Sequence, residues 1–97
     1  MSQDYLVASA VLTNDAGMHA RPSVKLTQLA RSFTANIEVA TDSAGPWVDA
    51  KSPVKLMRFR APQGATLWLR AAGEDAQRAL DEVLALVAGN FGEGAHG

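Results

Sequence analysis

The sequence predicts an α+β open sandwich, in which one small sheet is covered on a single face by helices. Segments with strand periodicity and segments with helix periodicity follow one another in the order β-α-β-β-α-β-α. The chain has 97 residues, of which 47% are hydrophobic, so it has the size of one domain with one modest core. We expect this domain to span residues 1–90, followed by a flexible glycine-rich tail over residues 91–97.

The first strand and the first helix are predicted before residue 34. Residues 5–13 are rich in small and β-branched apolar side chains and run into "NDAG", a turn composition, which predicts a strand. Residues 20–33 carry apolar side chains at the i, i+3, i+4 and i+7 spacing of one helix face, which predicts a helix. These positions are Leu26, Leu29, Ala30 and Phe33.

A hairpin and a short helix are expected next. Residues 34–40 alternate between apolar and polar side chains, and the strand pattern resumes over residues 47–50 after the turn sequence "TDSAGP". Ser52 precedes Pro53, the arrangement of a serine N-cap with proline at the first helical position. We therefore expect a helix of about two turns that "RAPQG" ends.

The last strand and helix complete the pattern. Residues 65–71 alternate, which predicts a half-buried strand. Glu74 and Asp75 then lead into an amphipathic segment over residues 76–90, which predicts a helix with acidic residues in its first turn and a Gly-Asn stop.

Composition and charge argue against several classes of function. Nine Lys and Arg against ten Asp and Glu give a net charge of -1, which provides no general attraction to nucleic acid or anionic lipid. The expected exposed strands also lack a set of stacking aromatic residues, which argues against RNA binding. The chain has no cysteine, no secretory signal pattern and no run long enough to span a membrane. These features favour a cytoplasmic protein without a cofactor, and a chain of this size is expected to be a monomer. No metal site is expected, because His19 and His96 are too differently placed to build one.

The stretch that carries chemistry is "GMHARP", residues 17–22. A neutral imidazole is a nucleophile, and His19 directly precedes the predicted helix, where unpaired backbone N–H groups favour an anion. Arg21 would add charge-assisted hydrogen bonds to a phosphoryl group on His19, and Gly17 permits a loop conformation that would strain other residues. A lone histidine at a helix start is more often a solvated or capping side chain. The cluster with Gly17, Arg21 and Pro22 weakens that interpretation, but its spacing alone does not establish phosphoryl transfer, so both interpretations remain open. We expect His96, in the tail, to be inert.

With "DAKSPVKLMRF", "PQGATLWLRA" and "GEDAQRALDEVLALV", this stretch resembles the HPr family of histidine-containing phosphocarrier proteins of the bacterial phosphoenolpyruvate-dependent phosphotransferase system, over residues 5–88. The resemblance implies a four-stranded antiparallel sheet with three helices on one face. It also implies that His19 accepts a phosphoryl group from enzyme I on Nδ1 and passes it to a IIA-type protein, with Arg21 neutralising the group. The "GMHARP" spelling and the "GNF" ending also resemble the nitrogen-related NPr branch.

The resemblance further implies a docking surface around His19. Its members are Val24 and either Thr27 or Gln28 on the first helix, with Pro53, Val54 and Met57 on the short helix. A core position is an equally good interpretation of Met57. For Lys25 and Lys55, steering of acidic partners and plain solvation remain open.

The resemblance also implies that Ser52 occupies the position that, in some bacteria, a dedicated HPr kinase phosphorylates. The N-cap alone also explains a serine there, and Pro53 and Val54 replace the hydrophobic sequence that usually follows it.

Two alternatives to the sugar-system carrier remain. One is a regulatory, nitrogen-related carrier that acts through phosphorylation-dependent binding. The other is an interaction module of the same fold that is never phosphorylated, against which the pairing of His19 with Arg21 argues.

Overall fold

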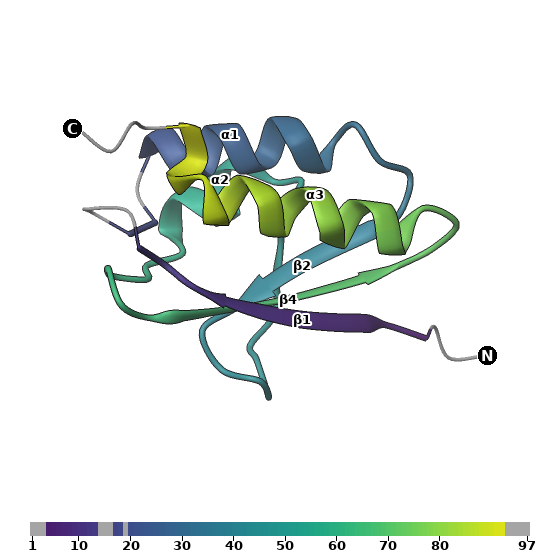
Figure 1. Cartoon of the computed structure of the whole chain (residues 1–97), viewed down its shortest axis with the longest axis horizontal. Coiled ribbons are helices and arrows are strands. Elements are labelled where there is room, and N and C mark those ends of the chain that lie inside the picture. The colour runs from purple at the N-terminus through teal and green to yellow at the C-terminus, as the bar shows by residue number, and fades with distance from the viewer. Residues whose placement is uncertain (1–3, 14–16, 19, 93–97) are drawn as a thin grey trace.

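The computed structural model describes residues 4–13, 17–18 and 20–92. Within these ranges, four strands form one antiparallel sheet in the order β1-β4-β2-β3, and three α-helices cover one of its faces (Figure 1). This arrangement confirms the predicted fold class and element order. The elements are β1 (Leu6–Val11), α1 (Ala20–Ala30), β2 (Asn36–Ala40), β3 (Val48–Asp49), α2 (Pro53–Arg58), β4 (Thr66–Ala72), α3 (Ala76–Ala88) and the 3-10 helix η1 (Asn90–Gly92).

Strand β4 lies at the centre of the sheet and shows the two faces most clearly. Its Leu67 and Leu69 are fully buried, whereas Trp68 and Arg70 between and beside them are partly exposed. Successive side chains of a strand point to opposite faces, so the leucines face the helices and Trp68 and Arg70 face away from them. The half-buried strand predicted from the alternation is thereby confirmed.

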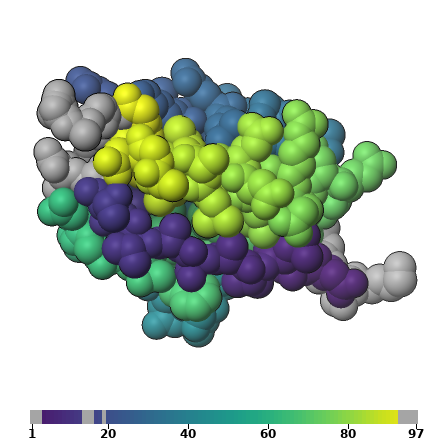
Figure 2. All heavy atoms as spheres, in the orientation of Figure 1, coloured from purple at the N-terminus to yellow at the C-terminus, as the bar shows by residue number. Residues whose placement is uncertain are grey.

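The helices bury the apolar faces that the spacing predicted. Leu26 and Ala30 of α1 and Val83 of α3 are fully buried. Helix α3 packs along β1, and Figure 2 shows its atoms directly above the purple strand. Removal of these side chains from water stabilises the layer by about 1.5–3 kcal/mol for each large side chain.

Helix α1 ends three residues earlier than the sequence pattern predicted. The Ser32 hydroxyl donates a hydrogen bond of 2.6 Å to the Leu29 carbonyl, and the Phe33 N–H donates to the Ala30 carbonyl at 3.2 Å. A serine hydroxyl that takes a helix carbonyl offers the backbone an alternative to the next helical turn. Phe33 is still buried, so its assignment to the core was right and the predicted helix end was wrong.

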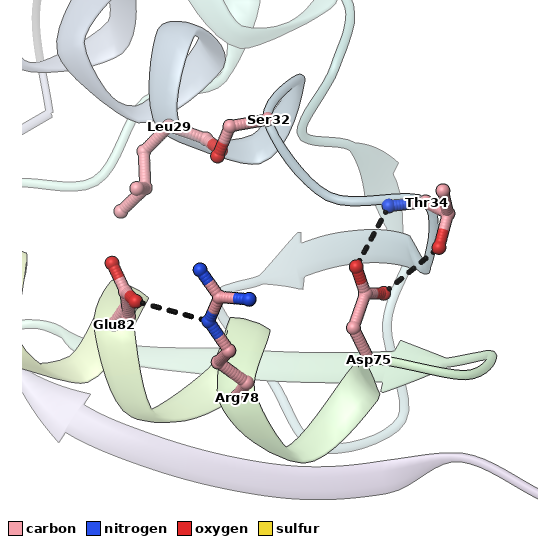
Figure 3. Close-up of polar contacts among 6 residues, drawn as sticks. All are labelled: Leu29, Ser32, Thr34, Asp75, Arg78 and Glu82. Atoms are coloured by element: carbon pink, nitrogen blue, oxygen red, sulfur yellow. Dashed lines mark hydrogen bonds and ion pairs between the residues drawn. The ribbon is translucent and has the colours of Figure 1, made fainter.

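The start of α3 also differs from the prediction, because its first turn contains no acidic residue. Asp75 is the N-cap residue, but its side chain makes no capping bond and reaches instead to the chain before β2. The carboxylate accepts the Thr34 N–H at 3.0 Å and the Thr34 hydroxyl at 3.2 Å (Figure 3). It also accepts the Ala35 N–H at 2.8 Å. These bonds, the Thr34 N–H first, lower the pKa of the Asp75 carboxyl, with desolvation opposing them. Asp75 therefore ties α3 to the entry of β2.

The packed fold extends past the predicted boundary at residue 90. Phe91 is fully buried, and its carbonyl accepts a 2.7 Å hydrogen bond from the Lys25 ammonium on α1. Asn90 accepts a 2.6 Å bond from the Thr13 hydroxyl. Figure 1 shows this yellow end of the chain beside α1. Residues 91 and 92 therefore belong to the core and its edge, whereas residues 93–97, with His96, lie outside the described residues.

Candidate functional site

His19 itself lies outside the described residues, but the residues on both sides of it are described. Met18 is buried and forms an isolated antiparallel bridge with Ala61, to whose carbonyl its N–H donates at 2.8 Å. Ala20 is the first residue of α1. The chain on either side of His19 is therefore held by a backbone bridge and by a helix.

Gly17 has a backbone conformation that favours glycine, with φ of +66°. A Cβ at this position would lie 2.2 Å from the Ala61 carbonyl oxygen and 2.6 Å from the Pro62 carbonyl carbon. The special loop conformation predicted for Gly17 is confirmed. The close approach of residues 61 and 62 is a second reason for glycine that the sequence did not reveal.

The N-terminal turn of α1 is electrostatically suited to an anion. The first N–H groups of a helix lack intrahelical acceptors, and the aligned peptide dipoles make this end positive. The first turn contains no acidic residue that would oppose this charge. Arg21 is exposed, and its side chain makes no hydrogen bond or ion pair with any residue in the described ranges. Its guanidinium is therefore available to an anionic group next to this helix end.

The five side chains predicted for docking are all accessible. Val24 is 44% exposed, Val54 61% and Met57 55%, while Gln28 is exposed and Pro53 partly exposed. The exposure of Met57 rules out the core interpretation. Thr27 is only 4% exposed, so Gln28 is the accessible member of the alternative pair.

Helices α1 and α2, which carry these side chains, pack against each other. The buried Ser23 hydroxyl on α1 contacts the Leu56 carbonyl of α2 at 3.4 Å, and Leu56 is fully buried. The residues predicted for docking therefore come from two helices that buried contacts hold together.

Lys25 and Lys55, whose roles the sequence did not decide, have different environments. Lys25 is partly buried, and its ammonium donates to the Phe91 carbonyl, so it holds η1 against α1. Lys55 is exposed on α2, and its side chain has no hydrogen bond or ion pair within the described part of the chain. Only Lys55 is therefore free to meet an acidic partner.

Ser52 is the N-cap of α2, as the sequence predicted. Its hydroxyl oxygen accepts the Lys55 N–H at 3.3 Å, and Pro53 is the first helical residue. The cap explains the serine structurally, and the side chain is still partly exposed to solvent.

The open face of the sheet holds an aromatic arrangement that the sequence analysis missed. The Arg70 guanidinium lies 4.1 Å from the ring centroid of Tyr5 and 4.3 Å from that of Trp47, and its Nε donates to Glu38 at 2.7 Å. The alternation of residues 65–71 places Arg70 on this face, but nothing in the sequence shows that two distant rings converge on it. Both rings stack on Arg70 and lie just outside β1 and β3, so the expectation that the exposed strands lack a set of stacking aromatics stays a prediction.

Known proteins resemble this chain over almost its whole length. Residues 7–89 match the family model described as "PTS HPr component phosphorylation site". The chain belongs to the HPr family. The HPr resemblance inferred from the sequence is confirmed, as is the fold that it implied.

Individual relatives agree with this assignment. This HPr-family chain is 43% identical over 89 residues to the phosphocarrier protein HPr of Cupriavidus necator, an alignment that covers 92% of this chain and 98% of the relative. It is 34% identical over 82 residues to the phosphocarrier protein NPr of Escherichia coli, covering 84% and 90%. A crystal structure of HPr-C-His from Thermoanaerobacter tengcongensis superposes with a TM-score of 0.82 at 30% identity, covering 92% and 98%. Both the HPr and the NPr branch are thus represented among its relatives.

No helix within residues 4–13, 17–18 and 20–92 is long and apolar enough to cross a membrane. In the same ranges, no three His, Asp or Glu side chains gather where a metal ion would bind.

Proposed function

We propose that this chain is a phosphocarrier that accepts a phosphoryl group on His19 from enzyme I and passes it to a IIA-type protein of the phosphotransferase system. The observation that carries the proposal is Arg21. It is exposed and without a partner among the described residues, at the positive end of α1, two positions after His19, in a chain of the HPr family. The relay would operate in the cytoplasm and needs no cofactor on this chain.

The proposed chemistry is a transfer between two proteins. The Nδ1 lone pair of His19 attacks the phosphorus carried by enzyme I, a phosphorus–nitrogen bond forms, and the bond to the donor group breaks. Phosphoryl transfer depends mainly on positioning and charge stabilisation, so one histidine is sufficient when the partner supplies the rest. The helix dipole contributes about 0.3–1 kcal/mol to the bound anion, and a charge-assisted bond from Arg21 about 1.5–3 kcal/mol.

Docking would use the apolar side chains of α1 and α2. We assign Val24, Val54 and Met57 as apolar contacts, with Gln28 and Pro53 at their border. Their exposure and the buried link between the two helices support this assignment. An exposed surface of mixed apolar and polar side chains suits a complex that must form and dissociate in every transfer cycle.

A regulatory phosphate on Ser52 is a finer part of the same proposal. A dedicated kinase would have to modify a hydroxyl that caps α2 and would place added negative charge at the N-terminus of α2, two residues before Val54. Incubation with an HPr kinase and ATP, followed by mass analysis of the parent and Ser52→Ala, tests this point. An acid-stable phosphate on the parent alone supports it, and none on either protein contradicts it.

Transfer kinetics with purified enzyme I test the carrier role and its docking surface. Arg21→Gln is expected to lower kcat/KM roughly 10- to 150-fold, because it removes a charge-assisted bond of about 1.5–3 kcal/mol. Val54→Ala and Met57→Ala are each expected to raise KM about fivefold, the effect of about 1 kcal/mol of lost contact. Val7→Ala, an equally exposed valine on β1, is the matched control and is expected to leave the kinetics unchanged. Equal effects of Val7→Ala and Val54→Ala would contradict the assigned surface.

A non-phosphorylated interaction module remains the competing function. It predicts that Arg21→Gln and the docking variants weaken partner binding while the parent gains no phosphate from enzyme I. No feature of the described residues favours it.

A further inference from the structure

A groove on the other side of α2 has cationic and aromatic walls that the carrier function does not use. Its volume is about 530 Å³, within the range of small-molecule sites. It lies between the β2–β3 hairpin and the last turn of α2. The residues that give it its chemical character are Lys55, Arg58 and Arg60, with Trp47, Phe59 and Pro46.

The cationic side chains of this groove make no hydrogen bond or ion pair with the described residues. Five of the nine Lys and Arg side chains bind a carbonyl or carboxylate oxygen: Lys25, Arg31, Lys51, Arg70 and Arg78. Within the described ranges, the other four have no side-chain hydrogen bond or ion pair. Arg21 is one of them, and the remaining three, Lys55, Arg58 and Arg60, all line this single groove.

The charge of the groove favours an anion. Two carboxylates, Glu38 and Asp49, also line it. Glu38 is neutralised by the Arg70 guanidinium at 2.7 Å. The Asp49 carboxylate accepts only the backbone N–H of Lys51, at 2.9 Å, and keeps its charge. Three cations without a partner among the described residues therefore face one uncompensated carboxylate. Guanidinium forks at two of the three positions match the oxygen geometry of a phosphate.

The aromatic wall is held in place before any ligand arrives. Trp47 is partly buried, and its indole stacks on Arg70, which is fixed in turn by Tyr5 and Glu38. Phe59 is partly buried against the core, and its N–H donates to the Lys55 and Leu56 carbonyls at 3.1 Å each. The backbone that carries the arginines on either side of Phe59 is thereby anchored. A ring that is already held in place lowers the ordering cost of binding a planar group.

We propose that this groove binds an organic phosphate with a planar ring, of the class of a nucleoside monophosphate. The phosphate would lie on Arg58, Arg60 and Lys55, and the ring would pack against Trp47 and Phe59. This site goes beyond the phosphocarrier role and does not involve His19 or Arg21, so either proposal can fail while the other stands.

The test uses the full chain and three probes: AMP, adenosine and ribose phosphate. Binding is followed by amide and indole NMR shifts. AMP is expected to produce saturable shifts at the Trp47 indole and at Arg58 and Arg60. Adenosine and ribose phosphate, each lacking one half of the ligand, are expected to bind about tenfold or more weakly.

Variants separate this groove from the other positive surfaces. Arg58→Gln together with Arg60→Gln is expected to weaken AMP binding at least about tenfold. Trp47→Leu is expected to weaken AMP but not ribose phosphate. Arg78→Gln on α3, whose side chain is 73% exposed, is the matched charge control and is expected to change nothing. Unchanged thermal midpoints establish that each variant is folded.

Four results would overturn the proposal. The first is the absence of saturable shifts up to about 10 mM AMP. The second is loss of binding in Arg21→Gln with retention in the groove double variant, which would place the phosphate at α1. The third is an equal loss in Arg78→Gln, which would indicate general charge attraction. The fourth is a groove response to an acidic peptide but not to AMP, which would identify a protein partner in place of a small phosphate.

Discussion

Replacement of Phe91 by alanine is expected to destabilise the protein strongly, although the sequence pattern assigned this residue to a tail. The side chain is fully buried, and the residue lies in the left-handed region with φ of 57°. Phe→Ala changes in protein cores cost about 3–5 kcal/mol. We take the lower end of this range, about 3 kcal/mol, as the expected loss.

This loss is large for a domain of 97 residues, whose total stability is roughly 5–15 kcal/mol. At about 4–8 °C for each kcal/mol, the midpoint of thermal unfolding should fall by about 12–24 °C. Urea unfolding followed by circular dichroism gives the free energy, and an unchanged denaturant slope would show that the unfolded state is the same.

Phe91→Leu is the matched control, because it demands the same backbone conformation but leaves most of the apolar volume in place. It is expected to cost less than about 1.5 kcal/mol. Val54→Ala, at an exposed position, should stay within about 0.5 kcal/mol of the parent. A loss below about 1 kcal/mol for Phe91→Ala would refute the assignment of Phe91 to the core.

Three further predictions concern the contacts that position the site. Because hydrogen bonds lower the pKa of Asp75 in the folded state, its ionised carboxylate stabilises the fold. This stabilisation is fully present above the unfolded-state pKa of about 3.9 and is lost as the pH falls through the lower folded-state pKa. Asp75→Asn should therefore lower the thermal midpoint at neutral pH and flatten its fall in acid, and an unchanged acid profile would contradict this. Ser52→Ala should cost about 1 kcal/mol by removal of the α2 cap, measured by urea unfolding, whereas Ser52→Asp, which keeps a cap, should cost less. Gly17→Ala should cost clearly more than Gly64→Ala, because both glycines have positive φ but only a Cβ at Gly17 meets backbone atoms. Equal losses of unfolding free energy would show that the contact with Ala61 adds nothing to the cost of Gly17→Ala.

The element order and the buried faces follow from local periodicity, which is why the sequence predicted them. Alternation in β4 and the helical spacing in α1 and α3 depend only on whether a position faces the core. Ser52 with Pro53 is likewise a local signal, and its cap was predicted correctly.

The errors concern residues whose partners are distant in the chain. Asp75 looked like an ordinary acidic residue at a helix start, but its bonds go to Thr34 and Ala35, about forty positions earlier. Phe91 followed a Gly-Asn stop signal and preceded a glycine-rich sequence, so only tertiary packing reveals its burial. Local pattern contains no information on such long-range contacts.

The same difference between local signals and long-range contacts applies to the candidate site. His19 and Arg21 were predicted because they lie two positions apart in a recognisable stretch, and the side chains predicted for docking are accessible. The groove at Arg58 and Arg60 was not predicted, because only the fold brings α2 next to Trp47 of the β2–β3 hairpin.

Intact mass after incubation with phosphoenolpyruvate and enzyme I tests the central claim most directly. The parent chain should gain one phosphoryl group that acid treatment removes, as expected for a phosphorus–nitrogen bond, and folded His19→Ala should gain none. Absence of a phosphoryl group on the folded parent, with an enzyme I that phosphorylates a known HPr in the same assay, would contradict the carrier function. The same acid-labile group on His19→Ala would contradict the assignment of His19 as its acceptor.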